Sequence, residues 1–134
     1  MIGLSASTDL PRIAEVLVAW DQNIHAALDR ILRYKNCRLR HVTTCREAIA
    51  FTHENETAVL ICGRKLPDGD WTTVLTELES SRKRPNLIVT SPLPDDALWA
   101  ELLNRGGCDV LSQPFDREEV FRVIDSAWRR WNFL

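Results

Sequence analysis

The residues best placed for chemistry lie in a short loop after the most apolar run of the chain. Ala58–Cys62 is unbroken apolar sequence, typical of a strand buried on both faces, and Leu-Pro-Asp-Gly-Asp-Trp follows at residues 66–71. Ligands of open parallel sheets usually bind beyond the carboxyl ends of the strands. Asp68 and Asp70 are therefore candidate functional residues. Their Pro/Gly context is also typical of a turn in which Asp70 caps a helix that begins at Trp71.

Other groups that could bind metals or phosphate lack the spacing that such sites need. The histidines at 25, 41 and 53 form no H-E-x-x-H or similar pattern, and the cysteines at 37, 45, 62 and 108 form no C-x-x-C pair. We interpret these cysteines as reduced structural thiols. No glycine-rich phosphate loop follows a strand, and the loop Asp21–Asn23 is too short and acidic to cradle a phosphate. The sequence thus predicts no metal and no other cofactor.

Composition limits the possible partners. The 134 residues include 17 Lys+Arg and 19 Asp+Glu, a net charge of −2 that gives no general attraction to nucleic acid or anionic lipid. No segment approaches the length of apolar sequence that spans a membrane, and Met1–Pro11 has no basic leader pattern. We therefore expect a cytoplasmic protein that binds neither nucleic acid nor membrane.

Strand and helix patterns alternate five times along the chain. The predicted strands cover residues 13–20, 37–42, 58–62, 86–90 and 108–111, and the predicted helices begin near Ile24, Thr44, Trp71, Asp95 and Asp116. In the second strand, Arg38 and Arg40 alternate with apolar residues, a pattern that suits a sheet edge. The alternation predicts right-handed βαβ units around a parallel sheet. We assign residues 1–11 to an N-terminal extension and 12–134 to one domain.

These motifs together resemble the receiver domain of two-component response regulators, over roughly Arg12 to Trp131. The resemblance is carried by L-P-D-G-D-W after the third strand, I-V-T-S at the fourth and S-Q-P-F-D-R-E-E before the fifth helix. Gly106 matches the glycine that ends the family's fourth helix. The resemblance implies an α/β, flavodoxin-like (CheY-like) fold, a doubly wound sheet of five parallel strands in the order 2-1-3-4-5 with five helices.

The residues that handle phosphate in receivers are mostly replaced in this chain. Receivers accept a phosphoryl group on an aspartate that ends strand three, with a divalent metal held by an acidic pair after strand one and a lysine on the phosphoryl oxygens. The acceptor position is Gly63, the acidic pair is Trp20 and Asp21, and the lysine position is Gln113. Of this pocket only Asp21 and the switch hydroxyl, Thr90, match the family. The resemblance therefore implies a degenerate receiver that is not phosphorylated at the usual place, in which Trp20 fills the vacated metal pocket.

Without that chemistry, the function must come from the surface. The usual partner face of receivers is formed by helix four, strand five and helix five, and here it carries Trp99, Leu103, Val110, Phe121 and Trp128. Aromatic residues often anchor interfaces, so we expect a signalling protein or a second copy of the chain to bind there, unless these rings pack into the edge of the core. The chain is then a signal-transduction module that acts by protein–protein interaction, and not an enzyme.

Two alternatives remain open from the sequence. Asp21, Asp68 or Asp70 could accept a phosphoryl group in place of the missing aspartate. Alternatively, the same flavodoxin-like scaffold could bind a small molecule such as a flavin or a nucleotide.

Overall fold

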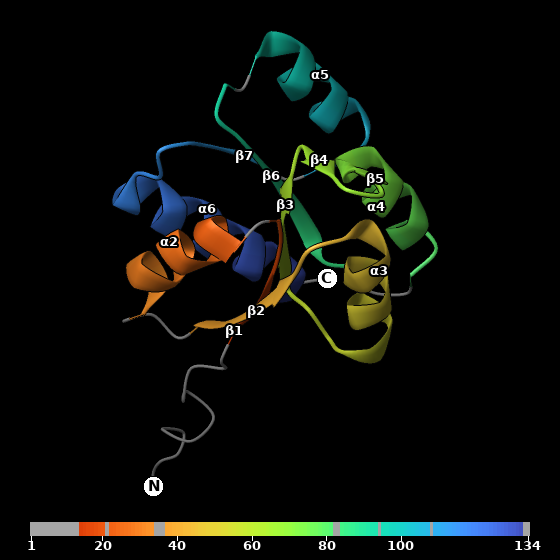
Figure 1. The fold of residues 1–134 in the computed structure, drawn as a ribbon, viewed down its shortest axis with the longest axis horizontal. Helices are drawn as coiled ribbons and strands as arrows, with labels where there is room; N and C mark the ends of the chain where they lie inside the picture. The colour runs from red at the N-terminus through yellow and green to blue at the C-terminus, as the bar shows by residue number, and fades with distance from the viewer. Residues whose placement is uncertain are drawn as a thin grey trace, which may run out of the picture.

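The computed structural model describes residues 14–20, 22–33, 37–81, 84–93, 95–107 and 109–132 (Figure 1). The N-terminal extension predicted for residues 1–11 lies outside these residues. The strands of the main sheet are β1 (Ala14–Ala19), β2 (Cys37–Val42), β3 (Val59–Gly63), β6 (Asn86–Ser91) and β7 (Asp109–Ser112). The helices of the described residues are α2 (Gln22–Leu32), α3 (Cys45–Glu54), α4 (Trp71–Leu78), α5 (Asp96–Asn104) and α6 (Arg117–Asn132).

The main sheet is parallel and has the strand order β2-β1-β3-β6-β7, which confirms the predicted doubly wound fold. Its central strand β3 is buried along its whole length. Because successive side chains of a strand point to opposite faces, β3 contributes to both halves of the core. Leu60 and Cys62 pack on the side of α3, α4 and α5, whereas Val59 and Ile61 pack on the side of α2 and α6 (Figure 1).

Strand β2 lies at the edge of the sheet, as the sequence predicts. Arg38 and Arg40 are exposed, and both guanidinium groups lie within ion-pair distance of the Glu15 carboxylate on the neighbouring strand, at 3.3 and 4.0 Å. The charged side chains thus discourage pairing of another strand with this edge and also link β2 to β1.

Two local features differ from the sequence-based expectations. Strand β3 extends to Gly63, which pairs with Thr90 of β6, so the strand ends one residue later than the apolar run. The following loop contains a two-residue antiparallel ribbon of β4 (Lys65–Leu66) and β5 (Gly69–Asp70), which the turn pattern did not predict. This ribbon places Asp70 directly at the start of α4.

Capping side chains fix where the helices begin. Thr44 is the N-cap of α3, and its hydroxyl accepts a hydrogen bond from the Glu47 amide. The Glu47 carboxylate accepts from the amide and the hydroxyl of Thr43, the residue before the cap. Asp95 caps α5, and Gly106 follows that helix with a φ of 79° that favours glycine.

None of the helices in the described ranges is both long and apolar enough to cross a membrane. Cys45 and Cys62 are free thiols, and Cys108 lies outside the described residues.

Candidate functional site

The candidate site lies at the carboxyl ends of the central strands, where open parallel sheets usually bind their ligands. Trp20 follows β1, Gly63 ends β3, Thr90 lies near the end of β6, and Gln113 follows β7. The structure therefore brings together four of the five residues predicted for the degenerate pocket. The fifth, Asp21, lies outside the described residues.

The indole of Trp20 covers Gly63. A Cβ atom at position 63 would lie 2.5 Å from Cγ and 2.6 Å from Cδ1 and Cδ2 of that ring. Carbon atoms of residues that only pack against each other do not come this close. No side chain therefore fits at position 63 while Trp20 keeps its place. The space in which a carboxylate would begin is occupied by the aromatic ring.

Both backbone groups of Trp20 are attached to strand β2. Its amide donates to the carbonyl oxygen of Val42 at 3.1 Å, and its carbonyl oxygen lies 2.8 Å from Nε2 of His41. These bonds hold the residue in register just beyond β1, with its ring over the end of β3. The position of the indole is thus determined by β2 as well as by its own strand.

On the other side of the site, the side-chain amide of Gln113 lies beside the hydroxyl of Thr90. Nε2 of Gln113 donates to Oγ1 of the fully buried Thr90 at 3.1 Å, and the backbone amide of Gln113 donates to the carbonyl oxygen of Ser91. The two bonds tie the end of β7 to β6. Gln113 therefore adds no positive charge to the site, and the Thr90 hydroxyl already has a partner.

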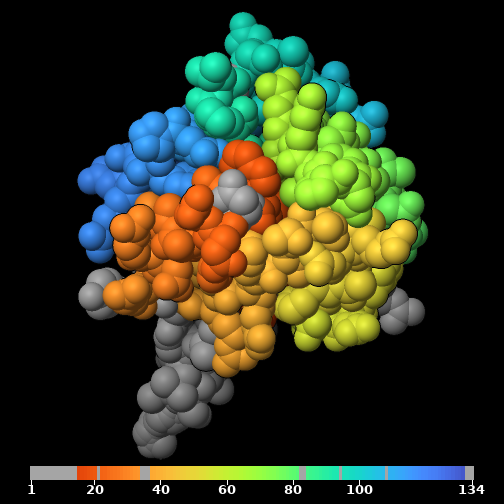
Figure 2. Space-filling model, in the orientation of Figure 1, coloured from red at the N-terminus to blue at the C-terminus, as the bar shows by residue number. Residues whose placement is uncertain are grey.

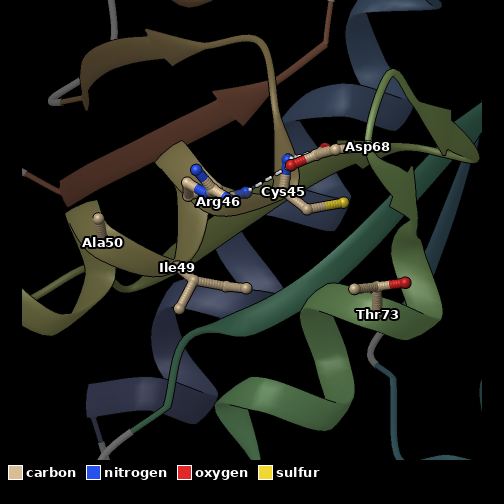
Figure 3. A pocket seen from close by; sticks show the side chains of 6 residues that line it. All are labelled: Cys45, Arg46, Ile49, Ala50, Asp68 and Thr73. Atoms are coloured by element: carbon tan, nitrogen blue, oxygen red, sulfur yellow. Dashed lines mark hydrogen bonds between the residues drawn. The ribbon is translucent and has the colours of Figure 1, made fainter.

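Asp68 is used as a second cap of α3. Its two carboxylate oxygens accept from the amides of Cys45 and Arg46, at 2.7 and 3.1 Å (Figure 3). These backbone bonds lower the pKa of Asp68. A shallow groove of about 380 Å³ lies beside them, lined by Cys45, Arg46, Ile49, Ala50, Asp68 and Thr73. The positive end of α3 already has its anion, so the groove does not offer those amides to a phosphate.

Asp70 caps α4, as the turn pattern predicts. Its Oδ1 accepts from the Thr72 hydroxyl and from the amides of Thr72 and Thr73, while the Thr73 hydroxyl accepts from the Asp70 amide. The Thr72 hydroxyl is the main cause of a lowered pKa of Asp70, and the two amides add to it. Both aspartates of the loop thus have structural roles.

The arrangement contains few of the groups that phosphoryl transfer needs. Within the described ranges, no three His, Cys, Asp or Glu side chains are placed so that they could hold a metal ion together. The acceptor position has no nucleophile, and the neighbouring cationic position is a neutral amide. Trp20, Gly63, Thr90 and Gln113 thus form an uncharged group at this end of the sheet.

The five residues predicted for the partner face are not equally accessible. Trp99 is 39% exposed and Leu103 is 66% exposed, both on α5, which lies at the top of the molecule in Figure 2. Val110 is buried in the core, so it does not present its side chain on this face. Phe121 and Trp128 are half-buried against the core between α6, α2 and the sheet. The sequence analysis missed Leu93, which is 82% exposed just before α5.

The strand order, with Trp20, Gly63, Thr90 and Gln113 at the carboxyl ends of the parallel strands, defines a doubly wound, flavodoxin-like domain. A model of the family described as response regulator receiver domain matches residues 16–125. The chain therefore belongs to that family.

Solved structures with the same fold are similar to this chain at low sequence identity. A signal receiver domain from Vibrio parahaemolyticus has a TM-score of 0.83 and 20% identity, covering 92% of this chain and 95% of that one. The signal receiver domain of an HD domain-containing protein from Pseudomonas fluorescens has a TM-score of 0.81 and 23% identity, covering 92% of each chain. A CheY-like receiver domain protein from Methanospirillum hungatei has a TM-score of 0.77 and 16% identity, covering 91% and 98%. A search of curated proteins found no match.

The contact between Trp20 and Gly63 gives a first prediction. Gly63 does not have a positive φ, so alanine fits the backbone there, and the penalty of Gly63→Ala should come from the indole alone. We expect the substitution to lower the free energy of unfolding by about 1–3 kcal/mol, a typical cost of overpacking. In a Trp20→Ala background the same change should cost almost nothing. Urea unfolding of the four proteins measures the coupling, and equal costs in both backgrounds would contradict the contact.

The cap at Asp70 gives a second prediction. Asp70→Ala should lower the free energy of unfolding by about 1 kcal/mol, whereas Asp70→Asn should keep most of it, because asparagine is also a good N-cap. The pKa of Asp70 is lower in the folded chain, so its charge adds stability above the ordinary aspartate pKa of about 3.9, and this contribution disappears as the pH falls below that value. Urea unfolding at neutral and acidic pH measures both effects. An Asp70→Ala variant as stable as the parent would show that this carboxylate is not a structural cap.

Proposed function

We propose that this receiver domain is not phosphorylated at the usual position and acts in cytoplasmic signal transduction by protein–protein contact, without enzymatic activity. The observation that carries the proposal is the Trp20 indole in the space of a Gly63 side chain. A phosphoacceptor needs both a carboxylate and room for the incoming phosphoryl group. Position 63 has neither. The free thiols of Cys45 and Cys62 fit a reducing compartment.

The charges at the site also support the absence of phosphorylation at the usual position. A transferred phosphoryl group carries negative charge that metal ions and cationic side chains normally stabilise. Gln113 supplies a neutral amide instead and is bonded to Thr90. Transfer of a phosphoryl group onto this end of the sheet would therefore lack both a nucleophile and the cation that stabilises the product.

A substitute acceptor in the loop has little structural support. Phosphorylation of Asp68 would remove a carboxylate that binds two amides at the start of α3, and phosphorylation of Asp70 would remove the cap of α4. Either carboxylate would have to give up hydrogen bonds to backbone amides before it could attack a phosphoryl donor. The Trp20 indole over Gly63 also occupies space that a small molecule at the ends of β1 and β3 would need.

The surface of α5 is the best-supported place for a partner. We define the α5 face as Trp99 and Leu103, which lie four residues apart on one side of the helix. The adjacent stripe of the same helix carries Leu98 and Leu102, which are buried and fix the helix on the sheet. A rigid helix that presents a tryptophan and a leucine to solvent offers an apolar anchor for a signalling protein or a second copy of the chain.

The closed pocket gives a third prediction, which tests the proposal directly. After incubation with acetyl phosphate and magnesium, the native chain should gain no phosphoryl mass. A variant with Trp20→Asp, Gly63→Asp and Gln113→Lys restores the acidic pair, the acceptor and the cation, and should gain one phosphoryl group. Intact-mass spectrometry measures both, and circular dichroism checks that the variant is folded. A phosphorylated native chain would overturn the proposal and would point to Asp21, Asp68 or Asp70.

The α5 face gives a fourth prediction. Sedimentation of the purified chain should report self-association that Trp99→Ala with Leu103→Ala abolishes, or a photo-crosslinking residue at position 99 should capture a signalling protein in cells. Matched changes at the exposed Thr76 and Glu77 of α4 should have neither effect. A chain that stays monomeric and gives no crosslink specific to position 99 would contradict contact through this face.

A further inference from the structure

Two histidines from different elements lie against each other beside Trp20. His25 is on α2 and His41 is on β2, and their ring centroids are 5.1 Å apart with an interplanar angle of 34°. Both residues are half-buried. The two histidines are 16 positions apart in the sequence. The packing of α2 against the sheet edge is therefore what brings the rings together.

The hydrogen bonds of the two rings are unequal. A carbonyl oxygen can only accept, so Nε2 of His41 donates to Trp20, and in the neutral ring Nδ1 is left without a proton. Nε2 of His25 is buried and has no hydrogen-bond partner among the described residues. Protonation at this atom would create a buried N–H group with no hydrogen-bond acceptor among the described residues.

The surroundings of His25 lower its pKa. Burial is the largest cause that lowers the pKa of His25, and repulsion by His41 of β2 adds to it. Asp29, on the same helix, acts in the opposite direction, but its carboxylate is also 3.7 Å from the guanidinium of Arg33. No charge from α6, the other helix packed against α2, contributes to the shift in the described residues.

We propose that His25 and His41 form a proton-sensitive latch on Trp20. While His25 is neutral, the two rings pack together, and His41 holds the Trp20 carbonyl so that the indole stays over Gly63. Protonation of His25 places a positive charge on a ring whose buried Nε2 has no hydrogen-bond partner among the described residues, separates the two rings, and loosens Trp20. The inference goes beyond the absence of phosphorylation and needs no partner, but it rests on the closed pocket of the proposed function.

A proton is the ligand that the geometry favours. Two imidazoles with no third His, Cys, Asp or Glu grouped with them in the described residues do not make a metal centre, and the free nitrogen of His25 is buried. The sign follows from the lowered pKa of His25, because the unfolded chain then binds more protons than the folded one below about pH 6.5. Stability from this pair is complete above that pH and is lost as the pH falls through the folded pKa.

The test follows the rings and the indole in the same full-length chain, with 5-fluorotryptophan at Trp20 assigned by Trp20→Phe. Proton NMR of His25 and His41 and fluorine NMR of Trp20 are recorded between about pH 8 and 5, the range in which histidine changes charge. We expect His25 to titrate below the ordinary histidine value and the Trp20 signal to shift with it. A Trp20 signal that is constant while His25 titrates would overturn the latch.

Three variants make the test specific. His25→Gln should remove the pH response of Trp20, and His53→Gln, on an exposed position of α3, should leave it unchanged. His41→Gln keeps an amide donor for the Trp20 carbonyl but removes the neighbouring charge, so it should raise the pKa of His25. A response that survives His25→Gln, or a His25 pKa unaffected by His41→Gln, would overturn the proposal. Neither result depends on whether acetyl phosphate modifies the chain, so the two proposals fail separately.

Discussion

The indole of Trp20 and a side chain at position 63 compete for the same space. Strands β1 and β3 are parallel neighbours, paired from Val16–Val59 to Ala19–Cys62. The residue that follows β1, Trp20, therefore lies beside the residue that ends β3, Gly63. A glycine at position 63 is what permits an aromatic ring after β1, and the ring in turn excludes any larger residue. The two residues therefore depend on each other, and together they place packed apolar area at the ends of β1 and β3.

Much of the fold follows from local patterns that tertiary packing reinforces. The apolar run before Gly63 predicts a central strand because only a strand covered on both faces avoids exposing it, and β3 is buried throughout. The alternating Arg38 and Arg40 predict an edge because charges are tolerated only where one face meets water. The ribbon of β4 and β5 could not be predicted, since turn residues specify a change of direction but not whether the flanking residues pair.

The candidate site was only partly predictable, because its contacts are non-local. The resemblance identified Trp20, Gly63, Thr90 and Gln113 as one group, but nothing in their types predicts that Gln113 bonds Thr90. Val110 shows the reverse difficulty. A position assigned to a surface by resemblance is buried here because a valine packs into the core. The contact of His25 with His41 depends on how a helix sits on an edge strand, which no short motif encodes.

These contacts indicate that an acidic residue introduced at one of these positions alone would meet an unfavourable environment. An aspartate at position 63 meets the indole, and an aspartate at position 20 would remove apolar packing while Gln113 still supplies no cation. Each change alone adds a cost before the electrostatic benefit of the complete set exists, so the three positions are expected to be strongly non-additive. In the same way His41, by holding the Trp20 carbonyl, connects the residue that covers Gly63 to the edge strand β2. The position of the indole therefore depends on the packing of that edge strand as well as on β1.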